Sequence, residues 1–235
     1  MKNKVRIYGI LMAIISVAIL PQTASGQSGE GLQLGARLGM SVSYFGETAK
    51  FEGGNPGLIL GASMQYNLID LLGVGVELTY HQQRGTRNET PVIDPAFVKV
   101  TERNLTMNTL EIPVLAIVNL PENGGLGIKL KAGYSFAYNM GVMAKDVNHY
   151  YFNDGNYLVL RGSENLGSDY NKIQHALIGS VGLAIPLDSG IFSGVSFDVR
   201  YRRGLSDIET SYSVLGGKTG QVRSQSLQVV LGFTF

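Results

Sequence analysis

Apolar and polar residues alternate with a period of two along most of this chain. Between residues 32 and 45, for example, Leu34 and Leu38 fall on one side while Gln33 and Arg37 fall on the other. Such alternation is typical of a β-strand with one apolar and one polar face. About eight runs of this kind recur, at residues 32–45, 57–68, 72–84, 104–119, 126–140, 173–186, 192–203 and 224–235. The pattern predicts an all-β chain.

The lengths of the runs and of the connectors between them favour a membrane barrel. Several runs reach ten residues, whereas strands of soluble proteins average about 5 to 6 and bilayer-crossing strands need about 9 to 11. The connectors after the second, fourth and sixth runs are brief, and the others are longer, up to about 30 residues between Gly141 and Lys172. Outer-membrane barrels show this alternation of short periplasmic turns and long external loops. We therefore expect an eight-stranded antiparallel up-and-down transmembrane β-barrel in the bacterial outer membrane. The architectural alternative is a soluble periplasmic barrel with its apolar face turned inward.

The start of the chain reads as a secretory signal. The basic stretch "MKNKVR" precedes an apolar run at residues 7–20 and the small residues Ala24, Ser25 and Gly26. An apolar run of this length is too short to span a bilayer as a helix. We expect residues 1–26 to be a cleaved signal peptide and residues 27–235 to be the barrel domain.

Charge and cysteine content exclude several classes of function. Loss of residues 1–26 removes three cationic side chains and lowers the formal net charge from +1 to −2, so nothing points to a nucleic-acid partner. The chain contains no cysteine, which excludes disulfides, thiolate metal sites and cysteine nucleophiles.

Charged residues of both signs gather on the polar face of the predicted strands. They are Arg37, Glu77, Glu111, Lys129, Lys131, Asp198, Arg200 and Arg202. In a membrane barrel this face lines the interior, and eight strands enclose a lumen just wide enough for side chains to fill it. We expect an internal salt-bridge plug. The alternative is a narrow gated channel for ions or small solutes.

The last predicted strand is apolar to its final residue. Leu231, Phe233 and Phe235 share one face. Because the last strand must pair with the first and face lipid along its length, this stripe suits barrel closure. We interpret these three residues as a C-terminal assembly signal, read by the barrel assembly machinery.

The longest predicted loop carries the best binding candidates. They are His149, Tyr150, Tyr151, Phe152 and Tyr157, in a stretch otherwise rich in Asn, Asp and Gly. Exposed aromatics with polar neighbours are typical of surfaces that bind a protein or a glycan. The bland alternative is that these aromatics only pack on the barrel rim.

Catalytic chemistry has little support in the sequence. The three histidines show no metal-ligand or triad spacing to one another, although Asp146, His149 and Asp154 could converge within the long loop. We expect no enzyme activity, no metal and no cofactor.

Two motifs resemble a known family. The stretches "TLEIPVLAIVNL" and "YRRGLSDI" resemble the PorT-like outer-membrane β-barrel family of Bacteroidetes-type bacteria. The resemblance implies an eight-stranded barrel of the small OmpA type and little about function, although the member that gives the family its name acts in protein secretion across the outer membrane. We expect a structural or partner-docking role through the external loops, with a link to a protein secretion complex as one form of it. Pro113 lies within the first motif, and we expect a β-bulge there because proline removes a ladder hydrogen bond.

Overall fold

The structure is a computed structural model that describes residues 31–46, 54–88, 92–123, 125–168, 170–187, 191–208 and 222–235. The predicted signal peptide therefore lies outside the described residues. Ten strands make up the described fold: β1 (Gly31–Gly46), β2 (Gly54–Asn67), β3 (Leu72–Asn88), β4 (Val92–Asp94), β5 (Phe97–Asn123), β6 (Leu126–Phe152), β7 (Tyr157–Asn165), β8 (Ile173–Pro186), β9 (Gly194–Gly204) and β10 (Arg223–Thr234). No helix long and apolar enough to cross a membrane occurs among these residues.

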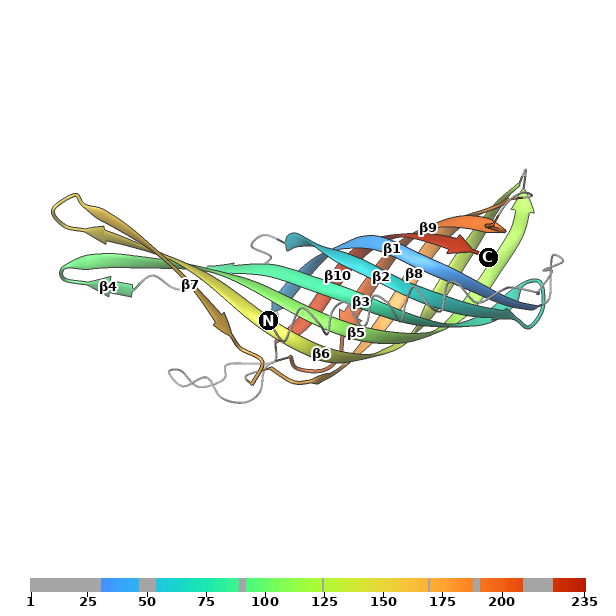
Figure 1. The fold of residues 1–235 in the computed structure, drawn as a ribbon, viewed down its shortest axis with the longest axis horizontal. Helices are drawn as coiled ribbons and strands as arrows, with labels where there is room; N and C mark the ends of the chain where they lie inside the picture. Colours follow the sequence, from blue (N-terminus) through green and yellow to red (C-terminus); the bar gives the residue numbers. More distant parts are fainter. Residues whose placement is uncertain are drawn as a thin grey trace.

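Eight of the strands close into a barrel (Figure 1). Around the ring the order is β1, β2, β3, β5, β6, β8, β9 and β10, and every pair is antiparallel. The first and last strands pair from Gly35↔Thr234 to Gly46↔Arg223, which closes the ring. The predicted eight-stranded antiparallel barrel is confirmed.

The two faces of each barrel strand differ in the way that a bilayer requires. Along β9 buried and exposed positions alternate, so Arg200 is buried while Val199 and Tyr201 are exposed. Large apolar side chains lie exposed around the ring, and Leu38, Val76, Leu130, Val181 and Val229 are examples. Apolar residues therefore face outward to lipid and polar residues face the lumen, as in outer-membrane barrels.

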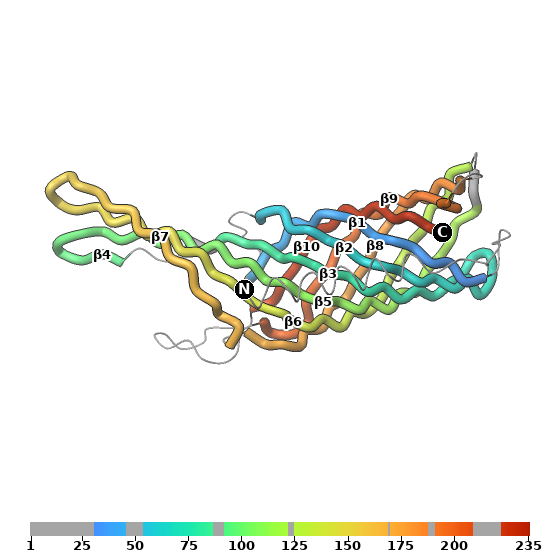
Figure 2. Tube along the Cα trace, viewed as in Figure 1, coloured from blue at the N-terminus to red at the C-terminus, as the bar shows by residue number. Residues whose placement is uncertain are grey.

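The two ends of the barrel are built differently (Figure 2). At one end lie the start of β1, the end of β10 and the brief connections between β2 and β3, β5 and β6, and β8 and β9. In outer-membrane barrels the short turns, the start of the first strand and the end of the last strand lie at the periplasmic end. The opposite end, from which the longest strands project, is the external one.

The prediction of an external loop of about 30 residues between Gly141 and Lys172 is wrong, because most of these residues form β-strands. Strands β5 and β6 contain 27 residues each and continue well beyond the barrel. There β4 pairs with β5, and β7 pairs with β6. We call the projecting part of β4, β5, β6 and β7 the external sheet. Polar residues on both of its faces hide the period-two pattern, which is why the sequence reads as a loop.

A bulge in β6 exchanges the faces of that strand. The β5 partners change from Thr109↔Asn139 to Asn108↔Gly141, so Met140 is an extra residue. The amide of Gly141 donates to the side-chain oxygen of Asn139 at 3.1 Å, which holds the bulge. Below it the odd-numbered residues of β6 face inward, and above it the even-numbered ones do.

The bulge expected at Pro113 is absent. Pro113 pairs with Ser135, and the β3 pairs on either side, Val76↔Val114 and Thr79↔Glu111, keep one register. The strand therefore passes the proline without an extra residue.

Candidate functional site

Two features of the molecule carry candidate function, and the first is the charged lumen. Glu77 on β3 accepts two hydrogen bonds from the guanidinium of Arg200 on β9, at 2.8 and 2.9 Å. Arg37 on β1 lies 3.5 Å from the same carboxylate. The two-bonded Arg200–Glu77 pair crosses the ring, and both side chains are buried.

A second carboxylate, Asp198 on β9, binds two cations. The ammonium of Lys131 donates to both of its oxygens at 2.8 Å, and Arg37 donates at 2.5 Å. Arg37 therefore joins Asp198 to Glu77, and the two ion pairs form one network.

The third carboxylate is Glu111 on β5. It accepts hydrogen bonds from Arg202 at 2.6 Å and from Ser135 at 2.8 Å. The ring of His81 lies between this carboxylate and Ser41: Nδ1 is 3.5 Å from Glu111, and Nε2 is 2.9 Å from the Ser41 hydroxyl. His81 was not among the predicted lumen residues, although it shares the polar face of β3 with Glu77.

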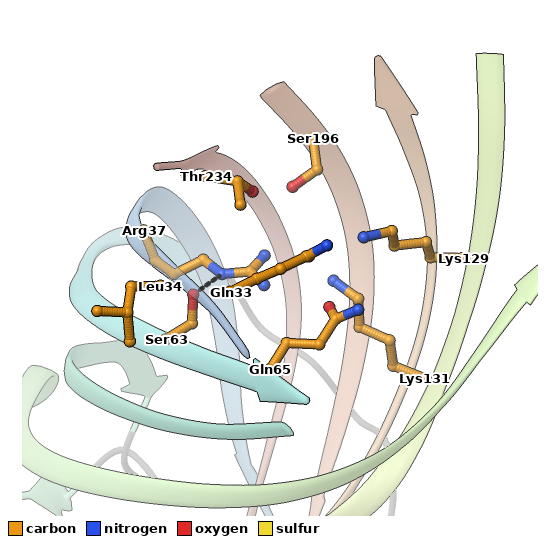
Figure 3. A pocket seen from close by; sticks show the side chains of 9 residues that line it. All are labelled: Gln33, Leu34, Arg37, Ser63, Gln65, Lys129, Lys131, Ser196 and Thr234. Carbon is orange, nitrogen blue, oxygen red and sulfur yellow. Dashed lines mark hydrogen bonds between the residues drawn. The ribbon is translucent and has the colours of Figure 1, made fainter. Parts of the chain in front are cut away.

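The structure brings seven of the eight predicted lumen residues into these ion pairs. The eighth, Lys129, lies on the same face of β6 as Lys131, nearer the periplasmic end. Both lysines and Arg37 line a cavity of about 20 Å³ at that end (Figure 3). Its other lining residues are Gln33, Leu34, Ser63, Gln65, Ser196 and Thr234.

An apolar cluster fills the lumen on the external side of the charges, and the sequence did not reveal it. It contains Leu105, Met107, Val142, Ala144, Leu166, Tyr170 and Ile208, with Phe45 and Val222 packed against it. Its members come from β5, β6, the segment after β7 and the segment after β9. Along the described residues, the lumen thus passes from a polar layer to a charged layer and then to an apolar one.

The external sheet is the second feature. Strand alternation divides the five predicted binding residues between its faces. His149, Tyr151 and Tyr157 share the face continuous with the lipid-facing surface, and their rings lie in a row with centroids 6.4 Å apart. The structure therefore does not bring all five together.

The other face of the external sheet is continuous with the lumen wall. It carries Tyr150 and Phe152, which contact Phe97 with ring centroids 5.5 and 6.1 Å apart. The ammonium of Lys99 lies 5.8 Å from the centre of the Tyr150 ring. Less aromatic surface is exposed on this face than on the face of Tyr151 and Tyr157, because Tyr150 and Phe97 are only partly exposed.

The residues considered for catalysis do not converge. Asp146 forms a two-bonded ion pair with Arg103, on the face opposite His149. Asp154 accepts hydrogen bonds from the backbone and side-chain nitrogens of Asn156, which lower the pKa of Asp154. Among the described residues, no three acidic or histidine side chains form a metal-binding group.

The C-terminal residues lie at the seam of the barrel. Leu231 is exposed on the lipid face, and the rings of Phe233 and Phe235 each lie against Phe192, with centroids 5.4 and 5.3 Å apart. The amide of Phe235 donates to the carbonyl of Leu34 at 2.9 Å. Their role as an assembly signal stays a prediction.

Comparison with known families agrees with this geometry. Residues 12–209 match the family described as outer membrane protein beta-barrel domain, which is more than half of the chain. The chain belongs to this family. The predicted location, the bacterial outer membrane, is thereby confirmed. Comparison with the curated proteins gave no match.

Comparison with solved structures gave several similar chains at low sequence identity. The attachment invasion locus protein Ail of Yersinia pestis is 12% identical, with 88% of this chain and 99% of that chain covered and a TM-score of 0.38. Neisserial surface protein A is 13% identical, with 89% and 100% covered and a TM-score of 0.41. The N-terminal barrel of OprF from Pseudomonas aeruginosa is 14% identical, with 88% and 100% covered and a TM-score of 0.34.

Proposed function

We propose that this outer-membrane barrel is an anchor that docks a protein partner at the cell surface through its external sheet. The observation that carries the proposal is the exposure of large apolar side chains outside the barrel: Tyr157 is 69% exposed, Tyr151 50% and Ile93 81%. Exposed aromatic and aliphatic groups gathered on a rigid element are typical of binding surfaces.

A protein partner fits the external sheet better than a glycan because the sheet also offers a free edge. Strand β7 pairs with β6 on one side, and no described residue pairs with its other side. An extended segment of a partner can add to such an edge through backbone hydrogen bonds, while Tyr151 and Tyr157 contact its side chains.

Photo-crosslinking in intact cells tests the docking proposal. A photoreactive residue at position 157 should give a discrete protein adduct, and Tyr151→Ser should weaken binding about tenfold. The control is the same photoreactive residue at position 201, which faces lipid. If position 157 gives no protein adduct in a correctly assembled barrel, the docking role is wrong and a glycan or a purely structural role takes its place.

We also propose a link to a protein secretion complex, which rests on the PorT-like motifs. A strain without this protein should then retain secreted proteins in the periplasm.

We propose no catalytic role, since Asp146, His149 and Asp154 are held apart. The channel alternative is disfavoured, because ion pairs and the apolar cluster occupy successive layers of the lumen.

A further inference from the structure

We infer that the cavity at the periplasmic end of the lumen binds a small monovalent inorganic anion such as chloride. Arg37 reaches the cavity from one side, and Lys129 and Lys131 reach it from the other (Figure 3). None of the nine lining residues is acidic. The walls thus present cationic and polar groups to a shared space.

The charge balance of the lumen network favours an anion. Its four cations are Arg37, Lys131, Arg200 and Arg202, and its three carboxylates are Glu77, Glu111 and Asp198. One positive charge is therefore in excess among these seven side chains. Because an uncompensated charge is costly away from bulk water, a bound anion beside this network lowers its free energy.

The size of the cavity selects the class of ligand. About 20 Å³ accommodates one water-sized or single-atom species. A halide ion is the kind of anion that a space of this size holds without movement of the lining side chains. Gln33, whose amide reaches into the cavity between the cations (Figure 3), supplies a neutral donor that suits a single-atom anion, while the side-chain nitrogen of Gln65 donates to Asn67 at 2.7 Å.

Bromide provides a direct test, because it replaces chloride and scatters anomalously. Crystals of the detergent-solubilised barrel grown in bromide should show an anomalous peak between Arg37 and Lys131. If the crystals show only an ordered water in the cavity, and no anomalous peak appears there after exchange into bromide, the inference is overturned.

Chloride-dependent stability provides a second test that needs no crystal. Replacing gluconate by chloride at constant ionic strength should raise the temperature at which half of the protein loses its heat-modifiable gel mobility. Lys131→Met removes the excess charge, and Ser196→Asp supplies a tethered carboxylate in place of the ion, so both should abolish the rise.

The matched control is Lys145→Met, at an exposed position in the external part of β6, which should keep the full chloride response. If Ser196→Asp and Lys131→Met both respond to chloride as the wild type does, the anion site is wrong. Should Lys131→Met fail to assemble, Ser196→Asp and the bromide crystals decide the question alone.

Discussion

Small residues stand beside the charged side chains of the lumen. Gly182 is the ladder partner of Asp198, and a Cβ atom on this glycine would overlap a carboxylate oxygen of Asp198. The absence of a side chain at Gly182 therefore lets Asp198 reach both Lys131 and Arg37.

Replacement of this glycine should disturb the network. Gly182→Ala forces Asp198 to move from its two partners, and we expect a loss of about 1 to 3 kcal/mol in unfolding free energy, the usual cost of overpacking a filled interior. Gly179→Ala is the matched control, because Gly179 lies on the same strand with open space where its Cβ would be. Urea unfolding in micelles measures both, and equal stability of the two variants would contradict this account.

The Arg200–Glu77 pair should matter far more than an exposed pair. Arg200→Met leaves Glu77 with Arg37 alone at 3.5 Å, and removing one partner of a buried pair costs about 3 to 5 kcal/mol. Arg103→Met breaks the Arg103–Asp146 pair of the external sheet, which is partly exposed, and should cost at most about 1 kcal/mol. The same urea titration compares them. A small effect at Arg200 would show that the lumen is hydrated enough to screen its charges.

The sequence could place the charged residues on the lumen face but could not pair them. Alternation determines the face of Glu77 or Arg200, and it carries no information on their height along the barrel axis, which depends on strand register. That Arg200 bonds Glu77 across 123 positions of sequence therefore needed the structure. His81 and Ser41 lie on the same polar faces of their strands as Glu77 and Arg37, so strand alternation could have added them to the predicted lumen residues.

At the scale of the element, the bulge at Met140 decides what the external sheet presents. Without it, the odd-numbered residues would continue to face inward, and Tyr151 would point toward the lumen side. With it, Val142 and Ala144 join the apolar cluster, while Met143 and Tyr151 are exposed. One inserted residue thus directs an aromatic row outward.

Cysteine labelling tests this exchange of faces directly, since the chain has no cysteine of its own. Lys145→Cys should react with a membrane-impermeant maleimide on intact cells, because Lys145 is an exposed, charged residue on the outward face above the bulge. Ala144→Cys, its neighbour in the buried cluster, should stay unreacted until the protein is unfolded. The reverse pattern would place the bulge elsewhere in β6.

Neither the bulge nor the external sheet could be predicted from the sequence. An extra residue in a strand leaves no compositional mark, although the Asn139–Met140–Gly141 segment shows in retrospect the side-chain bond that stabilises it. In the external sheet both faces meet water, so the hydrophobic alternation that revealed the barrel strands is lost. The barrel strands were predictable because one face of each meets lipid and the other lines the lumen, so apolar and polar residues alternate along them.

At the scale of the whole molecule, the layered lumen should block ion flow. Purified protein in planar bilayers should give no stepwise conductance above the baseline, with heat-modifiable mobility as the control for folding. Regular steps that Arg200→Met abolishes would instead favour the channel alternative.

Closure of the barrel should depend on the residue that follows β10. Removing Phe235 deletes the hydrogen bond to Leu34 and the ring contact with Phe192 at the seam. We expect the truncated chain to lose its fast-migrating unheated form and to accumulate in the periplasm. The matched control is Phe235→Tyr, which keeps an aromatic ring and the backbone hydrogen bond and should assemble. Normal assembly without Phe235 would remove the assembly-signal interpretation.

The long pairing of β5 with β6, which is interrupted only by register shifts at Asn108/Thr109 and Leu120/Asn123 along the described residues, has a mechanical consequence. The ladder runs from Asn123↔Leu126 at the periplasmic turn to Phe97↔Phe152 at the external tip. At about 3.3 Å per residue, a strand of this length extends roughly 90 Å, and it is far less stretchable than a flexible tether of equal contour. Because ladder hydrogen bonds lie perpendicular to the strands, a pull along the external sheet loads many of them in shear at once. A pulling force on a bound partner would thus be transmitted to the barrel wall, and the external sheet would stretch little under that force.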